Sequence, residues 1–172
     1  YVINGQKMWI TNSTQADYFC TLVNTSDGHH HKNKSLIIIP SKTPGVSIGG
    51  RIEKLGLRSS DTAPVFFDNV RVPCRYRIGK EGEGFKIALD ALNGGRIGIA
   101  SQAVGLARSA LEKATAYAKE RNQFGRPIAK FGSIRNKIAD MATDIDAARL
   151  LVLNAAHRKD NGLAYVKESA MA

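Results

Sequence analysis

The sequence predicts an α+β protein in which an antiparallel β domain is followed by a helical bundle. Through residue 79, short runs of β-branched and aromatic residues alternate with turn signals such as Asp27-Gly28, a pattern typical of antiparallel strands. From residue 82 onward, apolar residues recur at helical spacing instead. This change of period places the first domain at residues 1–79 and the second at residues 80–172.

The first domain is expected to contain several short strands. Asn4-Gly5 tolerates positive φ at both turn positions, so residues 1–3 and 7–10 are predicted to form the arms of a tight hairpin. Turn signals separate the runs that follow. Further strands are predicted at residues 18–23, 36–39, 46–48 and 65–72.

Two long helices are expected in the second domain. The first is predicted to begin at Gly84-Phe85, after a glycine-rich turn, and to end at Gly125-Arg126-Pro127. Its apolar residues at helical spacing are Ile99, Ala103, Leu106, Ala110, Leu111, Ala114 and Tyr117. The second helix repeats apolar residues at alternating intervals of four and three, which predicts a narrow packing stripe. This stripe consists of Ile134, Ile138, Met141, Ile145, Ala148, Val152 and Ala155.

The single tryptophan, Trp9, stands on a predicted strand directly before Ile10 and Thr11. Large aromatic side chains most often pack in a core or in a subunit contact. The alternative is a flat ligand, because an indole beside a planar heterocycle, with a hydroxyl two residues on, could hold a flavin or a base. The residues alone leave both interpretations open.

The chain carries 25 Lys and Arg residues against 15 Asp and Glu residues, a net charge of +10. Such an excess favours anionic partners. The basic residues are interspersed with acids, as in Lys119-Glu120-Arg121, rather than gathered in one stripe. A solvated surface is therefore the first interpretation, a phosphate-bearing small molecule the second and nucleic acid a distant third.

Other residue types limit the possible chemistry. Cys20 and Cys74 have no metal-type spacing, so two free thiols in a reducing compartment are expected. No apolar run approaches the length of a membrane span, and the N-terminus has no export pattern. His29, His30 and His31 are expected in a solvated loop rather than a metal site, because adjacent histidines do not aim three imidazoles at one ion. Both ends of the chain fall inside predicted elements, so we expect a fragment of a longer protein.

Four distinctive blocks follow one another along the chain. They are residues 2–12 (VINGQKMWITN), 54–62 (KLGLRSSDT), 94–102 (GGRIGIASQ) and 120–128 (ERNQFGRPI). With these blocks the sequence resembles the acyl-CoA dehydrogenase family, most closely its short-chain, butyryl-CoA-type branch. The resemblance implies a middle β domain of barrel or sandwich type and an up-down helical bundle. It also implies a longer subunit that binds FAD between the subunits of a homodimer or homotetramer.

The resemblance also implies which residues contact the cofactor. Trp9, Ile10 and Thr11 match the flavin-contacting tripeptide of the family, with the indole against the edge of the isoalloxazine and the threonine segment at its reactive end. Arg121 is expected to reach the FAD phosphates across a dimer interface, since a guanidinium can bond two oxygens at once. Phe124 is expected to pack near the dinucleotide. For Arg121, a solvated surface position is the alternative.

A substrate site is implied as well. Asn93, Gly94, Gly95 and Arg96 match the tetrapeptide that borders acyl-CoA in the family, with Arg96 as a polar contact. A second role for the glycines would be to break the helix. Two positions depart from the family pattern, since an aspartate is common where this chain has Asn93 and a glutamine where it has Gly132.

The catalytic base is expected outside this chain. Isovaleryl and long-chain members of the family carry a catalytic glutamate at the position of Gly95, whereas the short-chain branch uses a later glutamate. The resemblance therefore places the base C-terminal to Ala172, with no catalytic residue inside residues 1–172. We expect these residues alone to be inactive.

The expected function is FAD-dependent α,β-dehydrogenation of a short-chain acyl-CoA to the trans-2-enoyl-CoA, with electrons passed to an electron-transfer flavoprotein. Alternatives are a short branched-chain acyl-CoA dehydrogenase, and an acyl-CoA oxidase or flavin monooxygenase of the same fold. A basic RNA-binding module is a further alternative, against which the missing RNA-recognition aromatics count. The resemblance implies the mitochondrial matrix in a eukaryote and the cytoplasm in a bacterium.

Overall fold

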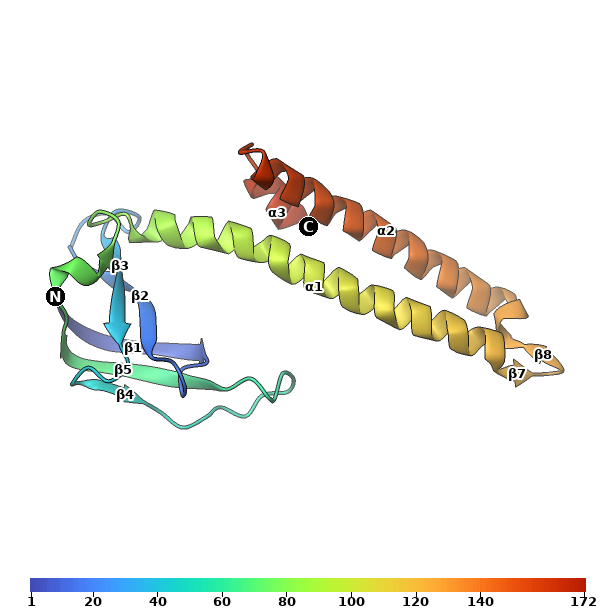
Figure 1. The fold of residues 1–172 in the computed structure, drawn as a ribbon, viewed down its shortest axis with the longest axis horizontal. Helices are drawn as coiled ribbons and strands as arrows, with labels where there is room; N and C mark the ends of the chain where they lie inside the picture. The colour runs from blue at the N-terminus through green and yellow to red at the C-terminus, as the bar shows by residue number, and fades with distance from the viewer. The chain divides into compact units, whose positions relative to one another are not determined.

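A computed structural model describes all of residues 1–172 and divides into two compact units, Tyr1–Leu89 and Asp90–Ala172 (Figure 1). The first unit holds two three-stranded sheets and the opening turns of a long helix. The second holds the rest of that helix and the helices that follow it. The predicted order of antiparallel sheets before helices is confirmed. The domain boundary after residue 79 stays a prediction.

Two sheets make up the β part of the first unit. The first has the strand order β1-β5-β4, formed by β1 (Val2–Thr11), β5 (Thr62–Arg71) and β4 (Val46–Ile48). The second has the order β2-β3-β6, formed by β2 (Tyr18–Asn24), β3 (Lys34–Pro40) and β6 (Arg77–Ile78). Every pair of neighbouring strands is antiparallel. A short 3₁₀ helix, Cys74–Tyr76, precedes β6.

The hairpin predicted at Asn4-Gly5 is wrong, because β1 runs straight through this dipeptide and pairs along its length with β5. The pairing register shifts between Ile3 and Gly5, and Gly5 has a φ of 137°. The Asn4 amide oxygen accepts a hydrogen bond of 2.7 Å from the backbone N–H of Asn69. The dipeptide thus forms a β-bulge. The predicted turn needs positive φ, and Gly5 adopts positive φ in the bulge as well, so the same dipeptide is compatible with either one.

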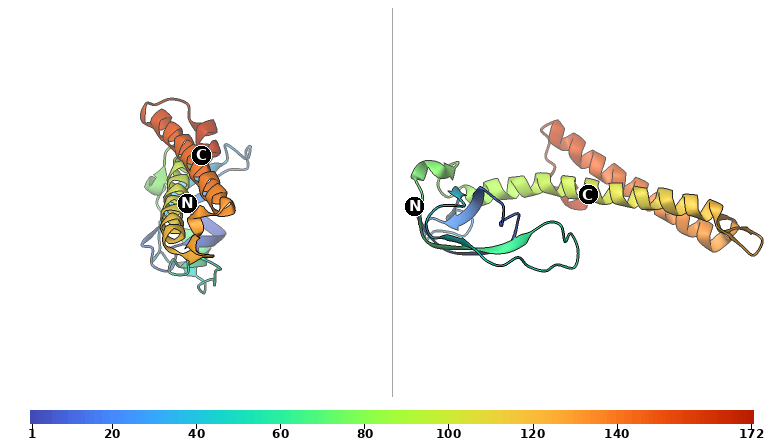
Figure 2. Two further views of the ribbon diagram at one scale, coloured as in Figure 1. Left: turned by 90° about the vertical axis from the view of Figure 1, so that its right-hand side faces the viewer. Right: turned by 60° about the horizontal axis from the view of Figure 1, so that its bottom comes forward.

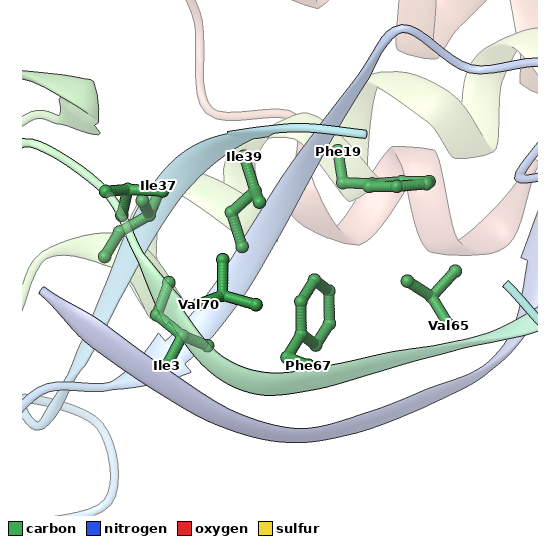
Figure 3. Packing of buried hydrophobic residues seen from close by; sticks show 8 residues of the cluster. Ile3, Phe19, Ile37, Ile39, Val65, Phe67 and Val70 are labelled. Atoms are coloured by element: carbon green, nitrogen blue, oxygen red, sulfur yellow. The ribbon is translucent and has the colours of Figure 1, made fainter. Parts of the chain in front are cut away.

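The core of the first unit lies between the two sheets (Figure 3). Ile37 and Ile39 of β3 and Phe19 of β2 face residues of β1 and β5. Along β3, residues alternate between buried and half-buried, which is the period of two expected for a strand with one face on a core. The buried cluster consists of Ile3, Phe19, Ile37, Ile39, Val65, Phe67, Val70 and Val72.

The long helix α1 (Gly84–Glu120) begins where predicted. A side chain at Gly84 would come within 2.5 Å of the backbone of Ser35 and Leu36, so only glycine lets the first turn of the helix approach β3 this closely. The buried Ser35 hydroxyl accepts a hydrogen bond of 3.0 Å from the N–H of Gly82. These contacts fix the start of α1 on the second sheet.

In the second unit, α1 is followed by a small hairpin and by α2, which runs antiparallel to α1 (Figure 2). Ile97, Val152 and Ala155 form the buried cluster between these helices. The elements after α1 are β7 (Asn122–Gln123), β8 (Arg126–Pro127), a 3₁₀ turn (Ile128–Lys130), α2 (Gly132–Asp160) and α3 (Val166–Met171).

Periodicity identified the packing face of α2 but not that of α1. The predicted α2 stripe includes the two residues of that helix that are buried, Val152 and Ala155. On α1, two of the apolar residues at helical spacing, Ile99 and Leu106, are 69% and 66% exposed. The face of α1 that packs against α2 contains Ile97 instead. Apolar residues occupy several faces of α1, so its spacing does not select one of them.

The structure shows neither a group of side chains that could hold a metal ion nor a helix that could cross a membrane. No cluster of three or more His, Cys, Asp or Glu side chains could hold a metal ion. His29, His30 and His31 lie in an exposed turn. Cys20 and Cys74 are free thiols. A bilayer-crossing segment is not found among the helices, since none is both long and apolar enough.

Candidate functional site

Trp9 lies near the end of β1 with its indole 64% exposed. The backbone there is left-handed, with a φ of 61°, and the pairing with β5 is irregular between Lys7 and Ile10. A bulky residue in this conformation costs about 1–3 kcal/mol and persists only where its surroundings impose it. A ring buried in the core of this chain is therefore excluded, and the indole is free to contact something outside these residues.

The two residues after Trp9 are held by regular pairing. Ile10 pairs with Ala63 and Thr11 pairs with Thr62. Ile10 packs on the core cluster, whereas Thr11 is exposed. One residue further on, the backbone turns again to a left-handed conformation. The structure therefore presents an exposed indole and an exposed hydroxyl on either side of an anchored isoleucine.

The loop that follows, residues 12–15, is fastened to Asp61. The Asp61 carboxylate accepts hydrogen bonds from the Thr14 backbone N–H at 3.1 Å, from the Thr14 hydroxyl, and from Gln15 Nε2 at 2.9 Å. The hydrogen bond from the Thr14 hydroxyl is the main cause that lowers the pKa of Asp61, against an opposing effect of burial. Sequence reasoning missed Asp61, because no spacing rule links residue 61 to residue 14.

A cavity of about 380 Å³ opens beside this strand end. Ile10, Thr11, Tyr18 and Cys20 are among its lining residues. Burial raises the pKa of the Cys20 thiol, which disfavours the nucleophilic thiolate. A larger cavity, of about 620 Å³, lies along residues 1–7 and does not include Trp9 or Thr11. Cavity volume alone therefore does not identify the candidate site. We identify it by the exposed side chains of Trp9 and Thr11.

The hairpin between α1 and α2 carries the second set of candidate residues. Phe124 and Gly125 connect β7 to β8 with φ values of 53° and 78°, as a two-residue turn of type I′ requires. The Phe124 ring is 91% exposed and meets Phe131 edge-on, with 6.2 Å between ring centroids. Arg121 follows the last residue of α1, and its side chain is exposed. Its backbone carbonyl accepts a hydrogen bond of 2.8 Å from the N–H of Ile128, which closes the base of the hairpin.

The third set lies on α1. Arg96 Nη1 donates a hydrogen bond of 3.0 Å to Asn93 Oδ1, one helical turn away. The glycines between them do not break the helix, which is continuous from Gly84 to Glu120, so that expected role is wrong. A side chain at Gly95 would meet nothing within 4 Å, whereas one at Gly94 would lie 3.0 Å from Lys159 Nζ. Open space therefore surrounds the α1 backbone at Gly95.

Arg96 and Arg121 cannot bind the same small group. At 1.5 Å per residue, about 38 Å of α1 separates residue 96 from residue 121. Within the second unit, Asn93–Arg96 and the hairpin are therefore too far apart to contact one small ligand. Trp9, Ile10 and Thr11 belong to the first unit.

Comparison with known proteins gives matches over almost the whole chain. The family model for the C-terminal domain of acyl-CoA dehydrogenases matches residues 82–172. The family model for their middle domain matches residues 1–70. The mitochondrial short-chain specific acyl-CoA dehydrogenase of Mus musculus is 45% identical over 172 residues, which make up 100% of this chain and 42% of that protein.

Solved structures agree with these matches. Butyryl-CoA dehydrogenase from Megasphaera elsdenii superimposes with a TM-score of 0.95 at 42% identity, over 100% of this chain and 45% of that one. The structure of PigA with FAD and proline gives a TM-score of 0.97 at 33% identity, over 99% of this chain and 45% of that one. The chain thus spans less than half the length of the relatives it matches.

Proposed function

Because this chain belongs to the acyl-CoA dehydrogenase family, we propose that the protein oxidises a short-chain acyl-CoA thioester to the trans-2-enoyl-CoA. The resemblance seen in the four sequence blocks is confirmed by both family models. The observation that carries the proposal is the uninterrupted match to a short-chain relative, at 45% identity over 172 residues. In this proposal the chain supplies the middle β domain and part of the helical bundle.

FAD is the proposed cofactor, and the exposed residues suit its parts. Trp9 presents an apolar face and Thr11 a hydroxyl, which fit the ring system of a flavin. Arg121 presents a planar guanidinium that suits phosphate oxygens, and Phe124 offers a second exposed ring beside it. When bound, FAD accepts the hydride and supplies the redox chemistry. The task of these residues is to bind and orient it.

The acyl-CoA is proposed to lie against Asn93, Gly94, Gly95 and Arg96. The open space at Gly95 lets a ligand approach the helix backbone. Arg96 is held by Asn93 at 3.0 Å and keeps further N–H groups available for a ligand carbonyl or phosphate. In this arrangement the chain binds and orients the thioester, and a glutamate beyond Ala172 removes the α proton.

Partners and location follow from the same proposal. A second copy of the same subunit would complete the cofactor site across a homodimer or homotetramer interface. An electron-transfer flavoprotein would receive the electrons, in the mitochondrial matrix of a eukaryote or the cytoplasm of a bacterium. These partners rest on the family and on the exposed hairpin between α1 and α2.

The test is an anaerobic titration of the purified intact protein with butyryl-CoA. We expect a bound flavin spectrum that bleaches in proportion to the substrate added. A parallel titration with a branched acyl-CoA of similar size separates the short-chain function from a short branched-chain one. A protein that carries no flavin, or a flavin that no acyl-CoA reduces, would refute the proposal.

An oxidase is the second candidate, favoured by the similarity to the prolyl acyl carrier protein oxidase AnaB, with a TM-score of 0.96 at 30% identity. The same sample separates the two functions. After reduction by substrate, air is admitted and the return of the oxidised flavin spectrum is timed. Slow return supports a dehydrogenase that needs a protein acceptor, whereas fast return assigns the protein to the oxidase group.

A further inference from the structure

The segment expected to touch the flavin has an unusual backbone that needs support. Trp9 and Asn12 are both left-handed, with φ values of 61° and 60°. Pairing with β5 secures Ile10 and Thr11 between them but ends at the Thr11–Thr62 pair. The residues after Thr11 therefore depend on contacts outside the sheet ladder.

Those contacts converge on one residue, Asp61. Its backbone carbonyl accepts a hydrogen bond of 3.1 Å from the N–H of Asn12. Its carboxylate binds Thr14 twice and Gln15 once, as described above. Ser13, between these residues, is fully buried, and its hydroxyl lies 3.3 Å from the carbonyl oxygen of Ala63. Each residue from 12 to 15 is thus tied either to Asp61 or, for Ser13, to Ala63 of β5.

The carboxylate of Asp61 has no other evident task. Asp61 as a whole residue is 8% exposed, and its carboxylate takes part in none of the four ion pairs of the chain. All its hydrogen-bond partners are neutral donors from the one loop. A buried carboxylate satisfied by several such donors orders a segment strongly, since losing it would leave those donors unpaired.

We propose that Asp61 is a positioning residue, which holds Trp9, Ile10 and Thr11 in the conformation that contacts the flavin. Asp61 itself touches neither flavin nor substrate in this role. The inference rests on the proposed function, because a change in the position of the tripeptide is detected through the spectrum and the affinity of the bound flavin. It assigns to residues 61 and 12–15 a task in cofactor binding.

The test compares Asp61→Asn with Asp17→Asn in the intact flavoprotein. Asparagine keeps the size of the side chain, but its amide N–H₂ cannot accept the hydrogen bonds from the loop. Asp17 is exposed and lies just beyond the loop, so its variant removes the same charge nearby. We expect Asp61→Asn to shift the visible flavin spectrum and to weaken FAD binding about tenfold, equivalent to about 1.4 kcal/mol. Asp17→Asn should change neither.

A second variant, Thr14→Val, keeps the inference testable if the Asp61→Asn protein does not fold. It removes only the hydroxyl donor to Asp61 and should alter the spectrum in the same direction. Combining Thr14→Val with Asp61→Asn should weaken FAD binding by less than the sum of the single effects, because both act through one contact. Additive effects would overturn the inference.

The outcomes also separate this inference from the proposed function. A wild-type protein without flavin refutes the proposed function. A wild-type protein with flavin, together with an Asp61→Asn variant of unchanged spectrum and FAD affinity, refutes the positioning role alone. Equal changes in Asp61→Asn and Asp17→Asn would also refute it, since they would show a general effect of charge.

Discussion

The guanidinium of Arg126 lies 4.4 Å above the ring of Phe131, a cation–π contact that links β8 to the residue before α2. Phe131 also meets the exposed ring of Phe124 edge-on. Phe131 thus contacts both Arg126 and Phe124 of the hairpin between α1 and α2, while Phe124 and the Arg121 side chain stay exposed. Phe124 and the Arg121 side chain thus bury little of their surface against their own chain.

Replacing Arg121 by Ala should weaken both FAD binding and subunit association. The physical reason is the loss of a charged donor to phosphate, which is worth about 1.5–3 kcal/mol. FAD affinity is measured by titration of the apoprotein, and association by sedimentation. Lys119→Ala, which removes the same charge from the last turn of α1, is the control. If Arg121→Ala leaves both quantities intact, Arg121 is a solvated surface residue.

Replacing Phe124 by Asn should separate stability from function. Phe124 has a φ of 53° and is 91% exposed, so its side chain adds strain without burial in this chain. Asparagine tolerates the left-handed region better. We therefore expect thermal unfolding of the apoprotein to be unchanged or to shift upward, while FAD affinity falls. A large loss of stability in the apoprotein would show that Phe124 serves its own fold instead.

Thr11→Ala should shift the flavin absorbance and slow its reduction by substrate. One hydrogen bond, worth roughly 0.5–1.5 kcal/mol net, would be lost. Stopped-flow reduction by butyryl-CoA gives the rate, and the oxidised spectrum gives the shift. Thr143→Ala on α2 is a matched control, because the Thr143 hydroxyl bonds only within its own helix, to the carbonyl of Ala139. An unchanged rate and spectrum in Thr11→Ala would remove Thr11 from the site.

Sequence periodicity predicted those parts of the fold in which local spacing and burial agree. The α2 stripe ending at Val152 and Ala155 is such a case, and so is the apolar run at residues 36–39, which predicted the strand β3. At Asn4-Gly5 the sequence predicts a hairpin where the structure has a bulge, because only long-range pairing with β5 distinguishes the two. The packing face of α1 was likewise undetermined, since its partner helix selects one of several apolar faces.

The candidate site was predictable only in part, for the same reason. The blocks in which they occur identify Trp9, Thr11 and Phe124 as candidate residues, and the structure shows all three exposed. The link from Asp61 to Thr14 does not, because it joins residues 47 positions apart. Contacts of this kind depend on the sheet that brings β1 and β5 together, and no local pattern records them.

Acid should weaken the hold of Asp61 on residues 12–15. The pKa of Asp61 is lowered in the folded protein, so its contribution to stability is complete above the unfolded value of about 3.9. That contribution is lost as the pH falls through the lower folded value. The wild-type protein should therefore lose more thermal stability than Asp61→Asn as the pH falls below about 4. Parallel pH profiles would show that Asp61 does not titrate with folding.

The last prediction concerns the catalytic base. Gly95 offers no proton acceptor, and a side chain built there would meet nothing within 4 Å, so α1 can accept a glutamate at this position. In the intact protein, removing the glutamate expected beyond Ala172 should nearly abolish flavin reduction by butyryl-CoA. Adding Gly95→Glu to that variant should restore part of the rate, because a carboxylate would again reach the α carbon. Gly95→Gln in the same background has nearly the same shape without a base and should restore nothing. Equal rates for the Glu and Gln variants, or robust turnover by residues 1–172 alone, would show that the catalytic centre is misplaced.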